Sequence, residues 1–397
     1  MSHPQKKRGI LAMPVAIFSS LRLTVVLLSL AMILIFVATL LQVKMGIHEV
    51  QLLYFQSWLA WLDVLPGEKK FSIPFPGGML LGALLLLNLL AAHIRRFQLR
   101  WQKAGLILVH AGIILMLLGE FFTAIYSVES HMQLDEGETS NYSESSRETE
   151  LALIQQTADG LETVHAIPSS RLKDGASFPF AGFELRIARF YRNSKIEDAS
   201  AADTSFDPLR ADRDIGAGLA VREKPHETAM DRRDLSTAFV EIHTPDGNSQ
   251  GRWLLSNALP GKQEFLIGGT TWKMILRKKR YYHPFSIRLE EFTHEKYLGT
   301  EIPKNFSSRI RFINTETGKN IPALIYMNHP LRDEGHTFYQ SGFVDSKGSD
   351  KQTSILQVVR NPAWTMPYVS CAMVGIGLIW IFLQHLIKAI RRRPSAA

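Results

Sequence analysis

Apolar residues along the 397-residue chain gather near its start and at its end, with a long polar stretch between them. Four runs are apolar enough for a helix that crosses a bilayer, which needs about 20 residues at a rise of about 1.5 Å each. These runs are residues 23–43, 77–94, 104–128 and 365–390. The pattern predicts a multi-pass α-helical membrane protein with four transmembrane helices.

The first run, LTVVLLSLAMILIFVATLLQV (23–43), follows Lys-Lys-Arg, as the apolar part of a signal peptide would. It is longer than the usual apolar segment of about 7–15 residues in such peptides, and no small-x-small cleavage site follows it. We therefore expect an uncleaved membrane anchor.

The polar stretch alternates apolar and polar residues with a period of two in several places, as half-buried strands do. Examples are FELRIARFY (183–191), TAFVEIHT (237–244), TTWKMILRKKRYYHPFSIRLEEF (270–292) and SSRIRFIN (307–314). Residues 129–363 are therefore predicted to form a large β-rich domain, a sandwich or a barrel-like fold. Within it, the turn-rich residues 195–235 predict a long loop or irregular excursion.

The net charge of +8 would suit a nucleic-acid binder if it were spread over the chain. Instead the excess of basic residues lies beside the apolar runs, at Lys6, Lys7, Arg8, Arg95, Arg96, Arg100, Lys103, Lys388, Arg391, Arg392 and Arg393. The positive-inside rule then places residues 1–22, 95–103 and 391–397 in the cytoplasm. Residues 44–76 become a short outer loop, and the β-rich domain lies outside.

The chain has one cysteine, Cys371, so it offers neither a C-x-x-C pair nor a disulfide framework. This excludes an oxidoreductase that works through its own thiols. Cys371 lies in the last apolar run and is expected to be a small buried residue. The sequence also shows no nucleophile elbow, P-loop, H-E-x-x-H or dinucleotide-binding fingerprint. No residue is therefore assigned an independent catalytic role.

His110 interrupts the apolar run GLILVHAGIILM (105–116) about 9 Å along the predicted helix. An ionisable residue at membrane depth is a functional hypothesis by default. Its neutral imidazole suits the iron of haem, whose apolar macrocycle can lie among Leu and Ile side chains. A histidine hydrogen-bonded to a neighbouring helix is the alternative.

Two further histidines, His93 and His385, lie near the cytoplasmic ends of their predicted spans and suit the membrane interface. We expect His93 to lie about two turns shallower than His110, too far along the helices to take the opposite face of the same iron. A second haem ligand is then expected from residues 365–390 or from another protein.

Two segments of the outer domain carry candidate chemistry. In NHPLRDEGHTFYQSGF (328–343), His329 and His336 flank a polar turn, but no third metal ligand is evident nearby. A structured turn that leads into a strand is the favoured interpretation, and a metal site is the alternative. RKKRYYHP (277–284) is expected to be a solvated strand edge, with binding of a haem propionate or an acidic partner as the alternative.

The order of these segments resembles the ResB family, also called CcsB, of System II cytochrome c biogenesis proteins. The resemblance includes SSLRLTVVLLSL (19–30), the three early spans and the outer domain. Its most specific part is NHPLRDEGHTFYQSGF (328–343), followed by SILQVVRNPAWTMPYVS (354–370), which leads into the last span.

The resemblance implies a subunit of a cytochrome c synthase complex in the bacterial inner membrane. It would help to move haem b across the membrane and present haem and apocytochrome c for thioether attachment. The implied partner is a ResC- or CcsA-like membrane protein with a WWD motif, and thioredoxin-like reductants would act on the apocytochrome. His110 matches the family's intramembrane haem ligand, with His93 in reserve. The alternative is a non-haem membrane scaffold that recruits partners on the outer face.

Overall fold

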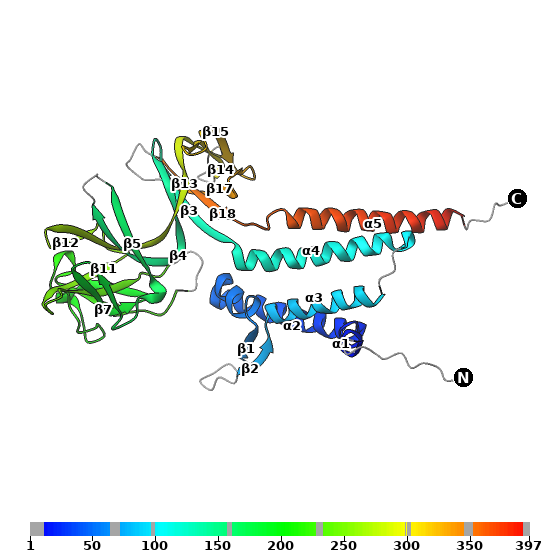
Figure 1. Ribbon diagram of the computed structural model, residues 1–397, viewed down its shortest axis with the longest axis horizontal. Coiled ribbons are helices and arrows are strands. Elements are labelled where there is room, and N and C mark those ends of the chain that lie inside the picture. The colour runs from blue at the N-terminus through cyan, green and yellow to red at the C-terminus, as the bar shows by residue number, and fades with distance from the viewer. Residues whose placement is uncertain are drawn as a thin grey trace. The chain divides into compact units, whose positions relative to one another are not determined.

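The computed structural model describes residues 12–63, 72–96, 100–156, 161–227, 233–297, 299, 303–344 and 352–391 (Figure 1). The basic residues Lys6, Lys7, Arg8, Arg392 and Arg393 lie outside this part of the chain. By their internal contacts, the described residues divide into two compact units. The helical unit comprises residues 1–128 and 361–397, and the β unit comprises residues 129–360.

The helical unit contains the four long apolar helices that the sequence predicts. Its helices are α1 (Ala12–Phe18), α2 (Leu21–Val50), α3 (Gly78–Arg96), α4 (Ala104–Tyr126) and α5 (Met366–Arg391), with the short 3-10 turn η2 (Trp101–Lys103) before α4. Helices α2 to α5 are long and apolar enough to cross a membrane. Short α1 was not predicted.

The segment expected to be an outer loop, residues 44–76, is largely regular. Helix α2 continues past a kink at Gly46 (φ 75°, ψ 157°), and the π-helical turn η1 (Gln51–Phe55) follows. Strands β1 (Leu59–Asp63) and β2 (Ser72–Pro76) then form an antiparallel hairpin. The reason is burial, because Val50, Tyr54 and Ala60 pack in one core with residues of α2 and α3. Such burial favours order over a free loop.

Glycines mediate the packing of α4 against α5, which lie side by side in Figure 1. Gly105, Gly112 and Gly119 are buried and recur every seven residues along one face of α4. A Cβ added at Gly112 would stand 2.8 Å from Cγ2 of Val374, so the backbones approach too closely for a side chain. Small residues at such spacing are typical of helix contacts within membranes.

The expectation that Cys371 is buried is wrong, because its side chain is exposed. Its neighbour Ser370 is fully buried at the contact of α5 with α4, beside Gly112. Successive residues of a helix are about 100° apart, so Cys371 turns away from that contact.

In its described residues, the β unit has three antiparallel sheets. The largest has ten strands, in the order β15-β14-β13-β4-β3-β18-β17-β16 with β12 and β5 attached; the others are β11-β10-β7-β6 and β8-β9. The strands are β3 (Val128–Asp135), β4 (Thr139–Gln156), β5 (Glu162–Pro168), β6 (Ser177–Phe180), β7 (Phe183–Tyr191), β8 (Ser194–Asp198), β9 (Leu219–Glu223), β10 (Thr237–His243), β11 (Ser249–Ser256), β12 (Gln263–Ile267), β13 (Thr270–Lys296), β14 (Pro303–Asn314), β15 (Lys319–Tyr326), β16 (Leu331–Asp333), β17 (His336–Val344) and β18 (Thr353–Arg360). The β-rich region predicted from the sequence is therefore present.

Long strand β13 contributes to both main cores of this unit. Its first half, with Trp272 and Met274, packs in a core with residues of β4, β7, β10 and β11. Its second half, with Phe285 and Ile287, packs in another core with residues of β3, β14, β17 and β18. The alternation of apolar and polar residues continues through both halves, which is why the whole segment is predicted as strand.

Residues 195–235 are more regular than the predicted loop. Strands β8 and β9 pair in antiparallel register, from Ser194 opposite Glu223 to Asp198 opposite Leu219. Buried Val221 belongs to a small separate core with Tyr191 and Phe239. A few apolar side chains thus order a segment whose composition is mostly polar.

Candidate functional site

His110 is held on α4 in one defined tautomer. Its Nδ1 lies 2.7 Å from the carbonyl oxygen of Leu106, one turn earlier in the helix. Since a carbonyl oxygen only accepts, Nδ1 carries the proton and Nε2 carries the lone pair. Histidines that ligate metals usually donate their second nitrogen to an oxygen in this way. The geometry therefore leaves Nε2 of His110 with a free lone pair.

His93 on α3 faces His110. The centroids of the two rings lie 5.1 Å apart, and the ring planes meet at 63°. The two rings are therefore in contact, although we expected His93 to lie about two turns shallower than His110. In antiparallel helices the Cα–Cβ bonds, each tilted toward its own N-terminus, lean toward one another along the common axis. This tilt brings together two side chains whose backbone positions are offset.

A second haem ligand from residues 365–390 or from another protein stays a prediction, and α5 does not face His110 in this unit. His110 lies about 140° to 180° around α4 from Gly105, Gly112 and Gly119, the residues that contact α5. The imidazole of His110 thus points away from α5. His385 on α5 is exposed. Within the described helices, His93 is the histidine that meets His110.

Asn88 fixes α3 against the start of the bundle, and the sequence interpretation overlooked it. Its side chain is buried, accepts a hydrogen bond from Thr24 Oγ1 at 2.7 Å and donates to the carbonyl oxygens of Phe18 and Ser20. A fully bonded amide within apolar helices is a strong positional constraint. The signal was available, because Asn88 is the one polar amide in the run 77–94.

The β unit contains a second histidine pair, which the sequence did not reveal. His283 on β13 and His336 at the start of β17 have ring centroids 5.0 Å apart, with planes at 80°. Phe285 contacts both rings. His283 and His336 are 53 residues apart, and only the sheet topology brings them together.

His329 does not join this pair. Its ring stacks on Tyr326 at 4.7 Å, and its backbone closes the turn after β15. His336 instead follows the two-residue turn Glu334–Gly335, in which both residues have positive φ. That geometry is typical of a tight β-hairpin. The predicted structured turn leading into a strand is confirmed at residues 333–336.

The basic segment 277–284 has a neighbouring strand on one side only, as expected of a strand edge: residues 277–282 pair with β4, whereas β12 pairs with β13 at residues 270–274 and β14 pairs with it from residue 286. The charges of this stretch are largely matched across the pair of β13 and β4. Arg277 forms a buried ion pair with Glu150 (3.0 Å), and Arg280 pairs with Glu144 (3.0 Å). These pairs leave little net positive charge for a haem propionate, so the segment has a structural role.

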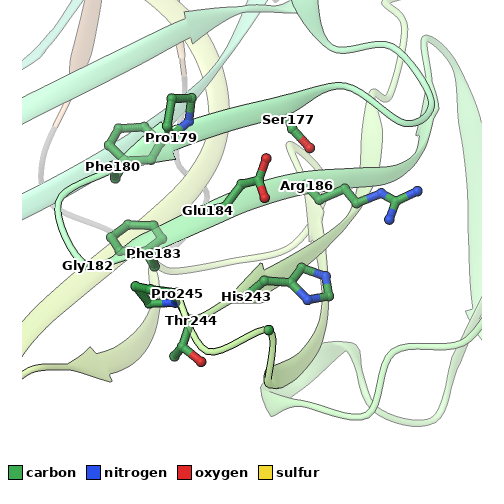
Figure 2. Close-up of a pocket in the computed structure, with 11 residues that line it drawn as sticks. Ser177, Pro179, Phe180, Gly182, Phe183, Glu184, Arg186, His243, Thr244 and Pro245 are labelled. Atoms are coloured by element: carbon green, nitrogen blue, oxygen red, sulfur yellow. The ribbon is translucent and has the colours of Figure 1, made fainter.

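A separate cavity of about 490 Å³ opens beside β6 and β7 in the β unit (Figure 2). Figure 2 shows a mixed lining with the charged side chains of Glu184 and Arg186, the imidazole of His243 and the rings of Phe180 and Phe183. His243 also contacts Glu241 at 3.3 Å. None of the site residues predicted from the sequence lines this cavity.

Comparison with known proteins finds similarity to a family and to one relative. Residues 265–354 match the ResB-like family. Protein NrfI of Wolinella succinogenes is 28% identical over 102 residues, which cover 25% of this chain and 11% of NrfI. The match to NrfI thus spans about a tenth of that relative's length. The family segment includes His283 and His336, whereas His93 and His110 lie outside it. Residues 265–354 of the β unit are thus similar to the ResB-like family.

Proposed function

We propose that this protein is a membrane subunit of a System II cytochrome c synthase complex that binds haem through His110. Similarity to the ResB-like family supports a role in cytochrome c biogenesis. The observation that carries the haem assignment is the histidine pair, His93 and His110, between two long apolar helices. A polar side chain without a partner costs free energy inside a membrane. A pair of histidines on two such helices therefore favours a role in binding a ligand.

The residues around His110 fit haem. Nε2 of His110 is free to bind iron because Nδ1 donates to Leu106. Leu106 and Ile113 are exposed on α4, so the helix presents apolar surface that can contact a macrocycle. Haem enters here as cargo, and the protein supplies an axial nitrogen and an apolar environment.

His93 is the reserve ligand. Two iron–nitrogen bonds of about 2 Å on opposite faces separate imidazole centroids by roughly 6.3 Å. The observed 5.1 Å is shorter, so α3 and α4 would have to part by about 1 Å for both rings to bind one iron. Among the described residues, His93 makes no hydrogen bond that fixes its tautomer, so we assign the principal role to His110.

The partners follow from the same proposal. A ResC- or CcsA-like protein with a WWD motif would provide the outer haem-handling surface, since these 397 residues contain no WWD sequence. The β unit would hold apocytochrome c near that chain on the periplasmic side, and thioredoxin-like proteins would keep the apocytochrome thiols reduced. No residue of this chain is assigned a bond-forming step.

The test uses the full chain purified in detergent and titrated with haem. We expect an absorption spectrum typical of imidazole-ligated haem, and loss of most bound haem in His110→Ala. His385→Ala is the matched control, because His385 is an exposed histidine of another long apolar helix. Equal haem binding by wild type and His110→Ala would remove the ligand role and favour the non-haem scaffold.

A further inference from the structure

The pair of His283 and His336 in the β unit is a ring contact in which hydrogen bonds fix the tautomer of each imidazole. His283 lies where β13 loses its pairing with β4, since the register shifts between Tyr282 and Ile287. Pro284, which has no N–H to donate to a neighbouring strand, follows it. The break frees the His283 side chain to face the start of β17.

A chain of hydrogen bonds fixes the tautomer of His283. Nε2 of His283 lies 2.8 Å from Ser143 Oγ, Ser143 Oγ lies 2.8 Å from Ser130 Oγ, and Ser130 Oγ lies 3.3 Å from the carbonyl oxygen of Val358. The carbonyl only accepts, so Ser130 donates to it, Ser143 donates to Ser130, and His283 Nε2–H donates to Ser143. This order alone satisfies all three contacts at once. Nδ1 of His283 therefore carries a free lone pair.

The tight turn before β17 fixes the tautomer of His336. Its Nδ1 lies 2.9 Å from the carbonyl oxygen of Glu334, to which it must donate. Glu334 has φ 47° and Gly335 has φ 73°, and this turn directs the carbonyl toward the ring. Asn314 Nδ2 holds the Glu334 carboxylate at 2.8 Å. Nε2 of His336 therefore carries the free lone pair.

Both imidazoles are neutral at neutral pH and reachable from solvent. Burial, with a smaller effect of His336, lowers the pKa of His283 to about 4. Burial also lowers the pKa of His336, with Arg360 acting in the same direction and Glu334 in the opposite one. Both side chains remain partly exposed. Neutral imidazole is the form that binds metals.

The spacing of the rings suits neighbouring positions on one small ion. With metal–nitrogen bonds of about 2.0 Å, each ring centroid stands about 3.1 Å from the metal, and ligand angles of about 90° to 110° separate the centroids by about 4.4–5.1 Å. The observed 5.0 Å lies in this range. The opposite faces of haem iron would require roughly 6.3 Å, so the geometry favours a free ion.

We propose that His283 and His336 form a two-imidazole site for a divalent transition-metal ion of the Zn²⁺ or Cu²⁺ class. Imidazole is a preferred ligand of these ions, and each ring donates its second nitrogen to an oxygen, as metal-bound histidines do. No third His, Cys, Asp or Glu gathers with them in the described part of the chain. The remaining positions are open to water or to a ligand from another molecule. This site does not depend on haem binding.

The test titrates the full chain in detergent with Cu²⁺ alone, followed by calorimetry and electron paramagnetic resonance, and repeats the calorimetry with Zn²⁺. We expect His283→Gln and His336→Gln each to remove one bound ion per chain. Nitrogen hyperfine couplings should indicate two imidazoles in the wild-type site. His329→Gln is the matched control, because His329 lies close in sequence but stacks on Tyr326.

Ser143→Ala separates ligation from folding. This variant keeps both imidazoles but removes the oxygen that fixes the His283 tautomer, so affinity should fall about tenfold or more. Unchanged stoichiometry and affinity in folded His283→Gln and His336→Gln would overturn the proposal. The same loss in His329→Gln would also overturn it, because it would indicate adventitious binding to surface histidines. Melting temperatures of all variants establish that they are folded.

Discussion

The imidazole rings of His93 and His110 meet with their centroids 5.1 Å apart, although they belong to different long apolar helices. The contact depends on two features of the helical unit. Asn88 anchors α3 through hydrogen bonds to Thr24, Phe18 and Ser20, and glycines turn the opposite face of α4 toward α5.

The two histidines should differ in their effect on haem. His110 has a tautomer fixed by Leu106, so His110→Ala should abolish most haem binding. His93→Ala should weaken binding less, because His93 lacks such an orienting bond in the described structure. Haem titration of both purified variants, monitored by absorption, measures the difference. A larger loss in His93→Ala would reverse the assignment of principal and reserve ligand.

Gly112→Ala should destabilise the helical unit. The added Cβ would stand 2.8 Å from Val374 Cγ2 and 2.9 Å from the carbonyl oxygen of Ser370. Overpacking of this kind costs about 1–3 kcal/mol, which exceeds the roughly 0.5–1 kcal/mol that alanine gains over glycine in a helix. Thermal unfolding in detergent measures the effect. Gly82→Ala on α3 is the control, since a Cβ there meets nothing within 4 Å; an equal effect of the two changes would contradict the packing account.

The buried pair of Arg277 and Glu150 should be costly to break on one side only. Their side chains are 8% and 6% exposed, so Arg277→Met leaves a buried carboxylate unpaired, at a cost of about 3–5 kcal/mol. The double change Arg277→Met with Glu150→Leu should recover much of this loss. Denaturant unfolding of the β unit within the full chain provides the comparison. If the double variant were as unstable as the sum of the two single variants, the pair would not be coupled.

The β unit should lose stability as the pH falls from about 6.5 to about 4. The pKa of His283 is lowered to about 4 in the folded protein, whereas an unfolded histidine titrates near 6.5. The unfolded state therefore binds more protons in this range, and the free energy of unfolding falls with falling pH. The expected contribution is up to about 3 kcal/mol. Melting temperatures of wild type and His283→Gln across this range should converge at low pH, and parallel curves would contradict the shift.

Local sequence patterns were sufficient to predict the helices and strands, but not the tertiary contacts between them. The apolar run 23–43 and the alternation in 270–292 predict α2 and β13 because period and length are properties of the segment itself. The regular structure in residues 44–76 was not predicted because it depends on a tertiary contact: Val50, Tyr54 and Ala60 are buried in one core with Leu81.

The site was predicted in part for the same reason. His110 is conspicuous in an apolar run, whereas its contact with His93 depends on the direction of side chains in antiparallel helices. The pair of His283 and His336 joins β13 and β17, which are 53 residues apart at these positions and are not neighbours in the order of the described sheet. No local signal in either segment indicates that contact.

The most direct test of the central claim is chemical rescue of His110. His110→Gly in the full chain should lose the absorption spectrum of imidazole-ligated haem, and free imidazole should restore it by occupying the vacated position. His385→Gly, treated in the same way, should keep the wild-type spectrum throughout. If His110→Gly binds haem with the wild-type spectrum before imidazole is added, His110 is not the ligand and the account is wrong.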